Sequence, residues 1–316
     1  MTTRNPSRIR RLAEELDEID PSILASPTEP VALLEELDYA LRPAVHERRV
    51  PSYGAFVEPT TPLAAWVEAA GFEVSRRRVE DLRDATVRRF ADGIVSWVVR
   101  DGEGVNDLVV FDRSVGSERD LTILAAATGG AIVQRHPTGR IRAVGTFGVL
   151  RRDDIDWHLE PPVERWLDLD RCHADSLPGT LLTRFVRFAV HDVGARRIGA
   201  LFVISPRGRL LSSAERRYGK PPEFNIDRPA DLAPLYHILG QLDGAAVFDE
   251  SGTLQELGVR LVPSVDAESN VDRYRGTRHT SALRYSYDDP AATLIVVSED
   301  GPVSVLRAGV RLGQSA

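Results

Sequence analysis

The sequence that decides the fold of the second half of the chain is LDGAAVFDESGTLQELGVRLV, residues 242–262. The apolar residues 245–248 and the longer run 253–262 have the length and composition of strands. Residues 249–252 read Asp-Glu-Ser-Gly, which is typical of a turn. We therefore predict two strands joined by a turn, the first preceded directly by a carboxylate and a glycine, Asp243 and Gly244.

Further helices and strands are expected around this pair. Apolar residues at helical spacing indicate helices, and short apolar runs that end at turn residues indicate strands. The expected helices are residues 178–193, 231–241 and 277–287, and the expected strands are residues 198–204, 293–298 and 303–306. These elements alternate without strict βαβ order. The pattern therefore favours an α/β fold with a mixed central sheet flanked by helices over a purely parallel sheet.

The first half of the chain has the pattern of a smaller α/β domain. Helices are expected at residues 12–19, 31–46, 61–70 and 117–127, and strands at residues 93–99, 107–111, 131–134 and 141–150. Residues 151–175 then lose any clear period and contain two consecutive prolines, Pro161 and Pro162. We place the domain boundary in this stretch, so that residues 1–165 and 166–316 form separate domains, each of ordinary size.

Composition limits the classes of function. The formal net charge of -7 lacks the basic field of a general nucleic-acid binder, so any phosphate site has to be local. The single cysteine, Cys172, can make neither an internal disulfide nor a thiolate zinc site. No run approaches the ~18 apolar residues of a membrane span, and residues 1–11 lack the apolar core of a signal peptide. We expect a cytoplasmic protein that binds neither nucleic acid nor membrane.

Three short clusters near the end of the sequence contain side chains that can bind ligands or take part in catalysis. Asp243 can hold a metal ion or accept a proton, and Gly244 lets a ligand approach the backbone. Residues 276–281 read Gly-Thr-Arg-His-Thr-Ser at the start of an expected helix, where backbone N–H groups and these side chains favour phosphate. Residues 297–301 read Val-Ser-Glu-Asp-Gly at a strand end. Taken singly, the first and third clusters are typical of ordinary turns.

Together, the order and spacing of these clusters resemble the diadenylate cyclase domain. That family carries an Asp-Gly-Ala motif, a Gly-Thr-Arg-His-Arg motif that opens a helix, and a Val-Ser-Glu strand end. Residues 197–201 look like its first core strand, and residues 261–263 look like the apolar segment before its variable loop. The resemblance extends over about residues 177–308. The first half resembles, more loosely, sensor-like domains fused ahead of such cyclases, through residues 108–113 and 133–135.

The resemblance implies a role for each matching residue. It implies that Asp243 binds a divalent metal ion, Mg²⁺ or Mn²⁺, and helps to activate the ribose 3′-hydroxyl of ATP, with Glu299 completing the metal site. Catalytic roles fall on Asp243, Arg278 and His279. Nucleotide contacts fall on Gly244, Ala245, Leu261, Thr277, Thr280, Ser281 and Ser298, with Leu261 packing on adenine. Each subunit is expected to hold one ATP, so a homodimer or larger homo-oligomer has to bring two sites face to face.

Two positions depart from the family pattern. Thr280 stands where the family has its second motif arginine, which removes a full positive charge from the triphosphate side. Losing one charge-assisted hydrogen bond to phosphate costs about 1.5–3 kcal/mol, or ~10- to 100-fold in affinity or rate. Leu242 stands where some members carry a metal-binding histidine, although other members lack it.

Three functions therefore stay open. The leading hypothesis is a metal-dependent diadenylate cyclase that condenses two ATP into cyclic di-AMP and pyrophosphate, regulated by its N-terminal domain. The alternative, which Thr280 favours, is a catalytically weakened nucleotide-binding sensor of ATP or a cyclic dinucleotide. A scaffold that shares only ancestry with the cyclases is the third hypothesis.

Overall fold

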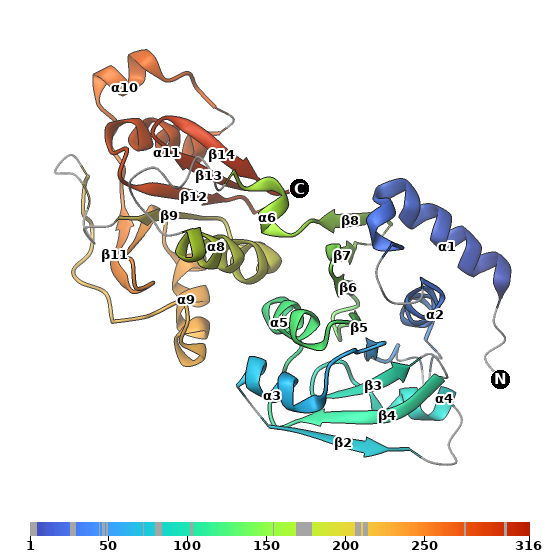
Figure 1. Cartoon of the computed structure of the whole chain (residues 1–316). Coiled ribbons are helices and arrows are strands. Elements are labelled where there is room, and N and C mark those ends of the chain that lie inside the picture. Colours follow the sequence, from blue (N-terminus) through green and yellow to red (C-terminus); the bar gives the residue numbers. More distant parts are fainter. Residues whose placement is uncertain are drawn as a thin grey trace. The chain divides into compact units, whose positions relative to one another are not determined.

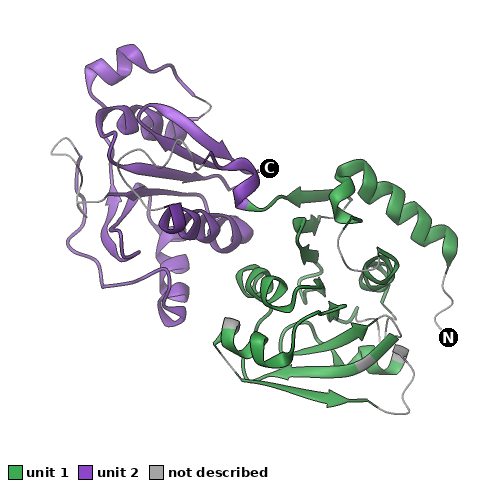
Figure 2. Cartoon of the chain, in the orientation of Figure 1, with its two compact units in different colours: residues 1–162 green, residues 163–316 purple. Residues whose placement is uncertain are grey.

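The computed structural model divides into two compact units, Met1–Pro162 and Val163–Ala316 (Figure 2). It describes residues 5–25, 30–43, 45, 48, 50–71, 73–79, 84–101, 104–153, 155–168, 179–205, 210, 214–274, 276–299 and 302–316. The division falls in the stretch where the sequence loses its period, a few residues before the boundary expected at residue 165. Cys172 and the first residue of the expected helix 178–193 lie outside the described residues.

The first unit is built on an eight-stranded sheet in the order β2-β4-β3-β1-β5-β6-β7-β8. The strands are β1 (Tyr53–Val57), β2 (Val74–Arg78), β3 (Ser96–Asp101), β4 (Gly104–Phe111), β5 (Ala131–Arg135), β6 (Ile141–Gly145), β7 (Gly148–Arg152) and β8 (Trp157–Glu160). β1 and β3 are parallel, and the other neighbours in this order are antiparallel. The first unit therefore has a mixed sheet.

Helices cover both faces of this sheet. They include α1 (Pro6–Ile19), α2 (Pro30–Leu41), α3 (Leu63–Ala70), α4 (Asp84–Val87) and α5 (Glu118–Thr128). One hydrophobic cluster joins α1 and α2 to Ala55 and Val57, and a second joins α3 and α5 to Phe56. Because successive residues of a strand point to opposite faces, the two clusters lie on opposite sides of the sheet.

A buried ion network ties α2 to the sheet of the first unit. Glu36 of α2 is fully buried. Its carboxylate accepts hydrogen bonds from Arg88 at 2.5 Å, from Arg100 of β3 at 2.8 Å, and from the hydroxyl of Tyr53 of β1. Burial alone would raise the pKa of Glu36, but the Arg88 guanidinium, with Tyr53 and Arg100, holds it below its ordinary value. The carboxylate therefore stays charged inside the unit.

The second unit is built on a six-stranded sheet in the order β11-β10-β9-β12-β13-β14 (Figure 1). The strands are β9 (Ala200–Ile204), β10 (Ala245–Phe248), β11 (Leu254–Val259), β12 (Thr293–Val297), β13 (Val303–Arg307) and β14 (Val310–Gln314). β9 and β10 are parallel, and the other neighbours are antiparallel. The mixed α/β fold expected from the sequence is confirmed.

Helices also cover both faces of the second sheet. α8 (Gly179–Arg187) and α9 (Pro229–Gln241) share one hydrophobic cluster with Phe202 of β9. α11 (Thr277–Asp288) shares the other cluster with Leu201 and Val203, the neighbours of Phe202 along the strand. α6 (Val163–Trp166) and α10 (Val265–Asn270) are shorter. The two clusters alternate along β9 as the pleat requires, so α11 packs on the face of the sheet opposite α8 and α9.

Several expected elements have different ends in the structure. The helix expected at residues 31–46 ends at Leu41, because Pro43 restricts the residue before it and cannot donate to a helix. The single strand expected at residues 141–150 is wrong. β6 and β7 form a hairpin there, and Gly148, at φ 111°, takes the backbone conformation that the turn needs. The expected helix 178–193 continues past Arg187 as a π-helical turn, Phe188–Val193.

Candidate nucleotide site

The predicted carboxylate–glycine pair lies where the chain enters β10. Because β10 lies between β9 and β11, Asp243 and Gly244 are at the start of an interior strand. Gly244 has φ 103°, and a Cβ on it would come within 2.7 Å of the Gly258 backbone. Only glycine fits this close approach of the two strands without displacement. The Asp243 side chain is exposed and makes no hydrogen bond or ion pair with any residue that the structure describes.

α11 begins with the predicted phosphate cluster. Its N-cap is Gly276, at φ 82°, and no side chain caps the helix. The first amides of α11 therefore keep their unpaired N–H groups and the positive end of the helix dipole available to an anion. Thr277, Arg278 and Ser281 add hydroxyl and guanidinium donors to the same end of the helix. This end of α11 has the groups that bind phosphate in many proteins.

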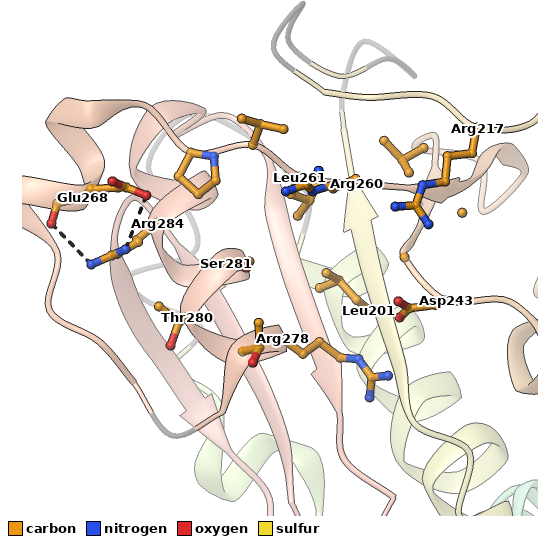
Figure 3. A pocket seen from close by; sticks show the side chains of 16 residues that line it. Leu201, Arg217, Asp243, Arg260, Leu261, Glu268, Arg278, Thr280, Ser281 and Arg284 are labelled. Carbon is orange, nitrogen blue, oxygen red and sulfur yellow. Dashed lines mark hydrogen bonds and ion pairs between the residues drawn. The ribbon is translucent and has the colours of Figure 1, made fainter.

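Both segments line one pocket of about 590 Å³ in the second unit (Figure 3). Among the residues predicted from the sequence, the pocket lining brings together Asp243, Gly244, Leu261, Thr277, Arg278, Thr280 and Ser281. The lining contains four arginines, Arg217, Arg260, Arg278 and Arg284, and two carboxylates, Asp243 and Glu268. The pocket is therefore positively charged within a chain of net charge -7, which makes it a suitable local site for phosphate.

The other predicted residues lie outside the pocket lining. Ala245 is fully buried in β10, and Ser298 and Glu299 follow the end of β12. The His279 ring lies against Tyr274, with ring centroids 5.5 Å apart. Burial and the charge of Arg278 lower the pKa of His279, so its imidazole is neutral at pH 7. The roles predicted for Ala245, His279, Ser298 and Glu299 stay predictions.

The side chains of Arg278 and Glu299 both lie close to Gly199, just before β9. A Cβ on residue 199 would lie 2.7 Å from Nη1 of Arg278, 2.8 Å from Cγ of Glu299 and 3.1 Å from its Oε1. Contacts under 3.0 Å are essentially absent for real Cβ atoms. Glycine therefore leaves the space that both side chains occupy, and the second and third sequence clusters come together at this point.

Thr280 lines the pocket, but its hydroxyl is used in the turn before α11. Its Oγ1 lies 2.9 Å from the carbonyl oxygens of Tyr274 and Gly276, and it accepts a hydrogen bond from the Tyr274 amide at 3.2 Å. A threonine hydroxyl carries a single hydrogen. In this arrangement Thr280 therefore has no donor left for a phosphate oxygen.

Comparison with known families divides the chain in the same way. Residues 10–160 match the family described as the probable sensor domain DACNK. Residues 187–311 match the DAC family, described as the DisA bacterial checkpoint controller nucleotide-binding domain. The chain therefore carries a DACNK domain followed by a DAC nucleotide-binding domain. The DACNK domain corresponds to the first unit, and the DAC domain lies within the second unit.

Two solved structures are similar to parts of this chain. A crystal structure described as a hypothetical membrane spanning protein from Bacillus cereus is 21% identical, covers 47% of this chain and 68% of that chain, and has a TM-score of 0.34. A crystal structure of a double mutant of DacA from Staphylococcus aureus is 24% identical, covers 42% of this chain and 86% of that chain, and has a TM-score of 0.29. No curated protein matches this chain. Within the described ranges, no helix has the length and apolar character needed to pass through a bilayer.

The pocket of the DAC domain also contains charged residues that the sequence clusters do not include. Arg284 donates from Nε to the Val271 carbonyl oxygen at 3.2 Å and from Nη2 to the Glu268 carbonyl oxygen at 3.3 Å, so it ties α10 to α11. Its spacing could have identified it, because it follows Thr280 by four residues on one helix face. Arg217 lies in a polar connection, where the sequence gives no comparable signal.

A divalent metal ion fits the DAC pocket if the substrate supplies part of its coordination. No group of three His, Cys, Asp or Glu side chains that could hold a metal occurs among the described residues. Mg²⁺ commonly binds one or two carboxylates together with waters and substrate phosphates. The exposed Asp243 carboxylate in the pocket suits this mode of binding. Asp243 would therefore hold the ion, and Glu299, which lies outside the pocket lining, is less well placed to share it.

Proposed function

We propose that the DAC domain joins two ATP molecules into cyclic di-AMP and releases pyrophosphate. The observation that supports this most strongly is the shared pocket, since Asp243 and the first turn of α11 line one cavity although they are distant in sequence. A carboxylate close to phosphate-binding donors is the arrangement needed for the attack of a sugar hydroxyl on a phosphate. The family match of residues 187–311 supports the same function.

In this proposal the residues of the pocket share the work of the reaction. The ribose 3′-oxygen of one ATP forms a bond to the α-phosphorus of the other, and the bond from that phosphorus to the bridging oxygen breaks to release pyrophosphate. Asp243 accepts the proton of the 3′-hydroxyl. Arg278, Thr277, Ser281 and the first amides of α11 hold the phosphates and balance their charge. When bound, Mg²⁺ or Mn²⁺ supplies further positive charge to the phosphates.

Two ATP molecules have to meet for this reaction. The pocket lies within one DAC domain and is expected to hold one ATP, so we propose that two chains place their pockets face to face in a homodimer or larger homo-oligomer. The two bond-forming steps are then equivalent by symmetry. We also propose that the DACNK domain regulates the reaction, which its description as a probable sensor supports.

A nucleotide sensor with weakened catalysis is the second candidate. It is supported by Thr280, which replaces a motif arginine and whose hydroxyl hydrogen is used in the turn before α11. With less positive charge on the phosphates, the pocket would stabilise a bound nucleotide more than it stabilises the developing charge of a leaving pyrophosphate. The pocket would then bind ATP or a cyclic dinucleotide without turnover.

Product analysis separates these candidates. The purified chain is incubated with ATP and either Mg²⁺ or Mn²⁺, and cyclic di-AMP is quantified. A cyclase makes product, loses roughly 100-fold or more of its rate in Asp243→Asn, and is unchanged in Asp272→Asn, whose exposed carboxylate lies outside the pocket lining. Nucleotide binding without product in the wild type supports the sensor. Absence of any adenine-nucleotide binding rules out both candidates and leaves the scaffold.

A further inference from the structure

A segment without any sequence motif forms one wall of the DAC pocket. Glu215 and Arg260 form an antiparallel bridge in which each backbone N–H donates to the carbonyl oxygen of the other residue at 3.0 Å. Since the pairing is antiparallel, Arg217 is brought alongside Gly258 at the end of β11. The next residue, Tyr218, packs its ring on Gly258, where a Cβ would be 2.5 Å from the ring. The backbone therefore holds Arg217 and Arg260 at the pocket, which both of them line.

The guanidinium groups of this wall have few partners within the protein. Arg217 makes no ion pair or side-chain hydrogen bond with the residues that the structure describes. Arg260 pairs with Glu215 at 3.3 Å, but the two side chains are 63% and 56% exposed, so water screens the pair. The adjacent Arg216, in contrast, is bound to Glu256 at 3.0 Å and lies outside the pocket lining. Arg217 and Arg260 thus keep donors for a ligand.

The opposite wall of the pocket lacks one charge that the family motif provides. Thr280 is neutral, and the guanidinium of Arg284 is bonded to two carbonyl oxygens of the α10 segment. Arg278 is therefore the available cation on the α11 side of the described pocket. In the view of Figure 3, the Asp243 carboxylate lies between Arg278 and Arg217. A triphosphate held beside Asp243 by Arg278 would need further positive charge, and Arg217 and Arg260 can supply it.

We propose that Arg217 and Arg260 form a second phosphate-binding wall, which binds the terminal phosphates of the nucleotide and supplies the positive charge absent at position 280. The proposal rests on the proposed function, in that the ligand is a nucleoside triphosphate in this pocket. Arginine suits this role because its guanidinium is always charged and presents paired N–H donors to phosphate oxygens. In the cyclase reaction the same wall would stabilise the charge that develops on the leaving pyrophosphate.

Calorimetric binding of ATP, ADP, AMP and adenosine to the full chain, with Mg²⁺ present, tests the phosphate wall. For Arg217→Gln and Arg260→Gln we expect ATP affinity to fall by roughly 10-fold each, because each loses one charge-assisted hydrogen bond to phosphate. Adenosine affinity should be unchanged, and the loss for AMP should be smaller than the loss for ATP. Arg216→Gln is the matched control and should bind all four ligands like the wild type.

Two results would overturn the phosphate wall. Equal losses for ATP and adenosine would mean that these arginines contact the base or the ribose, and unchanged ATP affinity would mean that they contact no part of the ligand. Because binding is measured separately from product, a chain that binds ATP without making cyclic di-AMP would refute the cyclase and still test the wall. A wild type that binds none of the four ligands would refute both. Thermal unfolding of the variants establishes that they are folded.

Discussion

The hydroxyl of Thr280 is hydrogen-bonded to both backbone groups of Tyr274, donating to the carbonyl oxygen at 2.9 Å and accepting from the amide at 3.2 Å. These bonds close the turn that leads into α11, and the carbonyl oxygen of Gly276 lies at the same 2.9 Å distance from the hydroxyl. A short hydroxyl side chain can make this closure, whereas the long cationic side chain of arginine cannot. Threonine at this position therefore stabilises the geometry of the turn before α11 instead of contributing charge.

Restoring the family residue should consequently fail to improve the site. We expect Thr280→Arg to lower the free energy of unfolding by about 1–2 kcal/mol, because two backbone groups of Tyr274 lose their partner. ATP affinity should not rise, since the new charge comes with a disordered turn. Urea unfolding and calorimetry measure the two quantities. Thr280→Ser keeps the hydroxyl and should stay within about 0.5 kcal/mol of the wild type. Tenfold tighter ATP binding by Thr280→Arg at unchanged stability would contradict this interpretation of Thr280.

Gly199 should affect function more than stability. The atoms closest to a Cβ on residue 199 belong to the side chains of Arg278 and Glu299, and the nearest is Nη1 at the flexible end of Arg278. In Gly199→Ala the end of Arg278 can move away and the Glu299 side chain can rotate, so the free energy of unfolding should change by less than about 1 kcal/mol. The displaced Arg278 leaves its proposed position at the phosphates, and we expect ATP affinity to fall by roughly 10-fold. Denaturant unfolding and calorimetry measure both effects.

A second glycine provides the control for this substitution. Gly240 lies in α9, and a Cβ on it would meet no atom within 4 Å. Gly240→Ala should raise stability by up to about 1 kcal/mol, as alanine replaces glycine in a helix, and leave ATP affinity unchanged. Equal affinities in Gly199→Ala and the wild type would show that Arg278 does not need the space at residue 199.

The strands of the second unit could largely be predicted from the sequence, because short apolar runs between turn residues leave little choice. Strands such as β2 and β14 could not. β2 contains three consecutive arginines and lies at the edge of the described sheet, paired with β4, so its structure depends on this pairing and not on an apolar pattern. The boundary between β6 and β7 could not be predicted either. Residues 141–150 are mostly apolar and have the pattern of one strand, and the turn between the two strands contains no strong turn signal besides its glycines.

The residues of the candidate site that belong to sequence motifs could be predicted, whereas those that reach the pocket through long-range pairing could not. Asp243 and Arg278 could be identified from their clusters, and the structure places both in one pocket. Arg217 reaches the pocket only through the bridge between Glu215 and Arg260, a long-range pairing that no local pattern encodes. His279 was predicted to be catalytic from its motif, but its contact with Tyr274 depends on the turn before α11. Sequence gives the chemistry of a residue, and packing decides where it points.

The first unit should lose stability in acid through Glu36. The folded-state pKa of Glu36 lies below the ordinary value of 4.5, so the unfolded chain binds the proton more readily than the folded chain. Its contribution is complete above pH 4.5 and is lost as the pH falls through the lowered folded-state value. Hydrogen exchange of the β1 and β3 amides, followed from pH 6 downward, should show protection that falls in this range.

Substitution of Glu36 tests the same network at neutral pH. We expect Glu36→Gln to destabilise the first unit by roughly 3–5 kcal/mol at pH 7, because Arg88 loses the buried carboxylate it is paired with and Arg100 keeps Glu35 as its remaining counter-charge. The loss of protection in acid attributed to Glu36 should then disappear. Glu14→Gln changes an exposed carboxylate of α1 and should leave both results unaltered. An acid profile that is identical in Glu36→Gln and the wild type would assign the acid sensitivity to other groups.

The titration of His279 reports whether Arg278 holds its position beside the pocket. Burial and the nearby Arg278 guanidinium both lower the pKa of His279. Removing the charge in Arg278→Gln should raise this pKa toward 6.5 without reaching it, since burial still disfavours the imidazolium. NMR titration of the His279 ring protons in the intact chain measures the change, and Arg216→Gln, whose side chain is paired with Glu256, should not alter it. If His279 titrates identically in Arg278→Gln, the guanidinium does not face the imidazole, and the proposed position of Arg278 at the phosphates loses its electrostatic support.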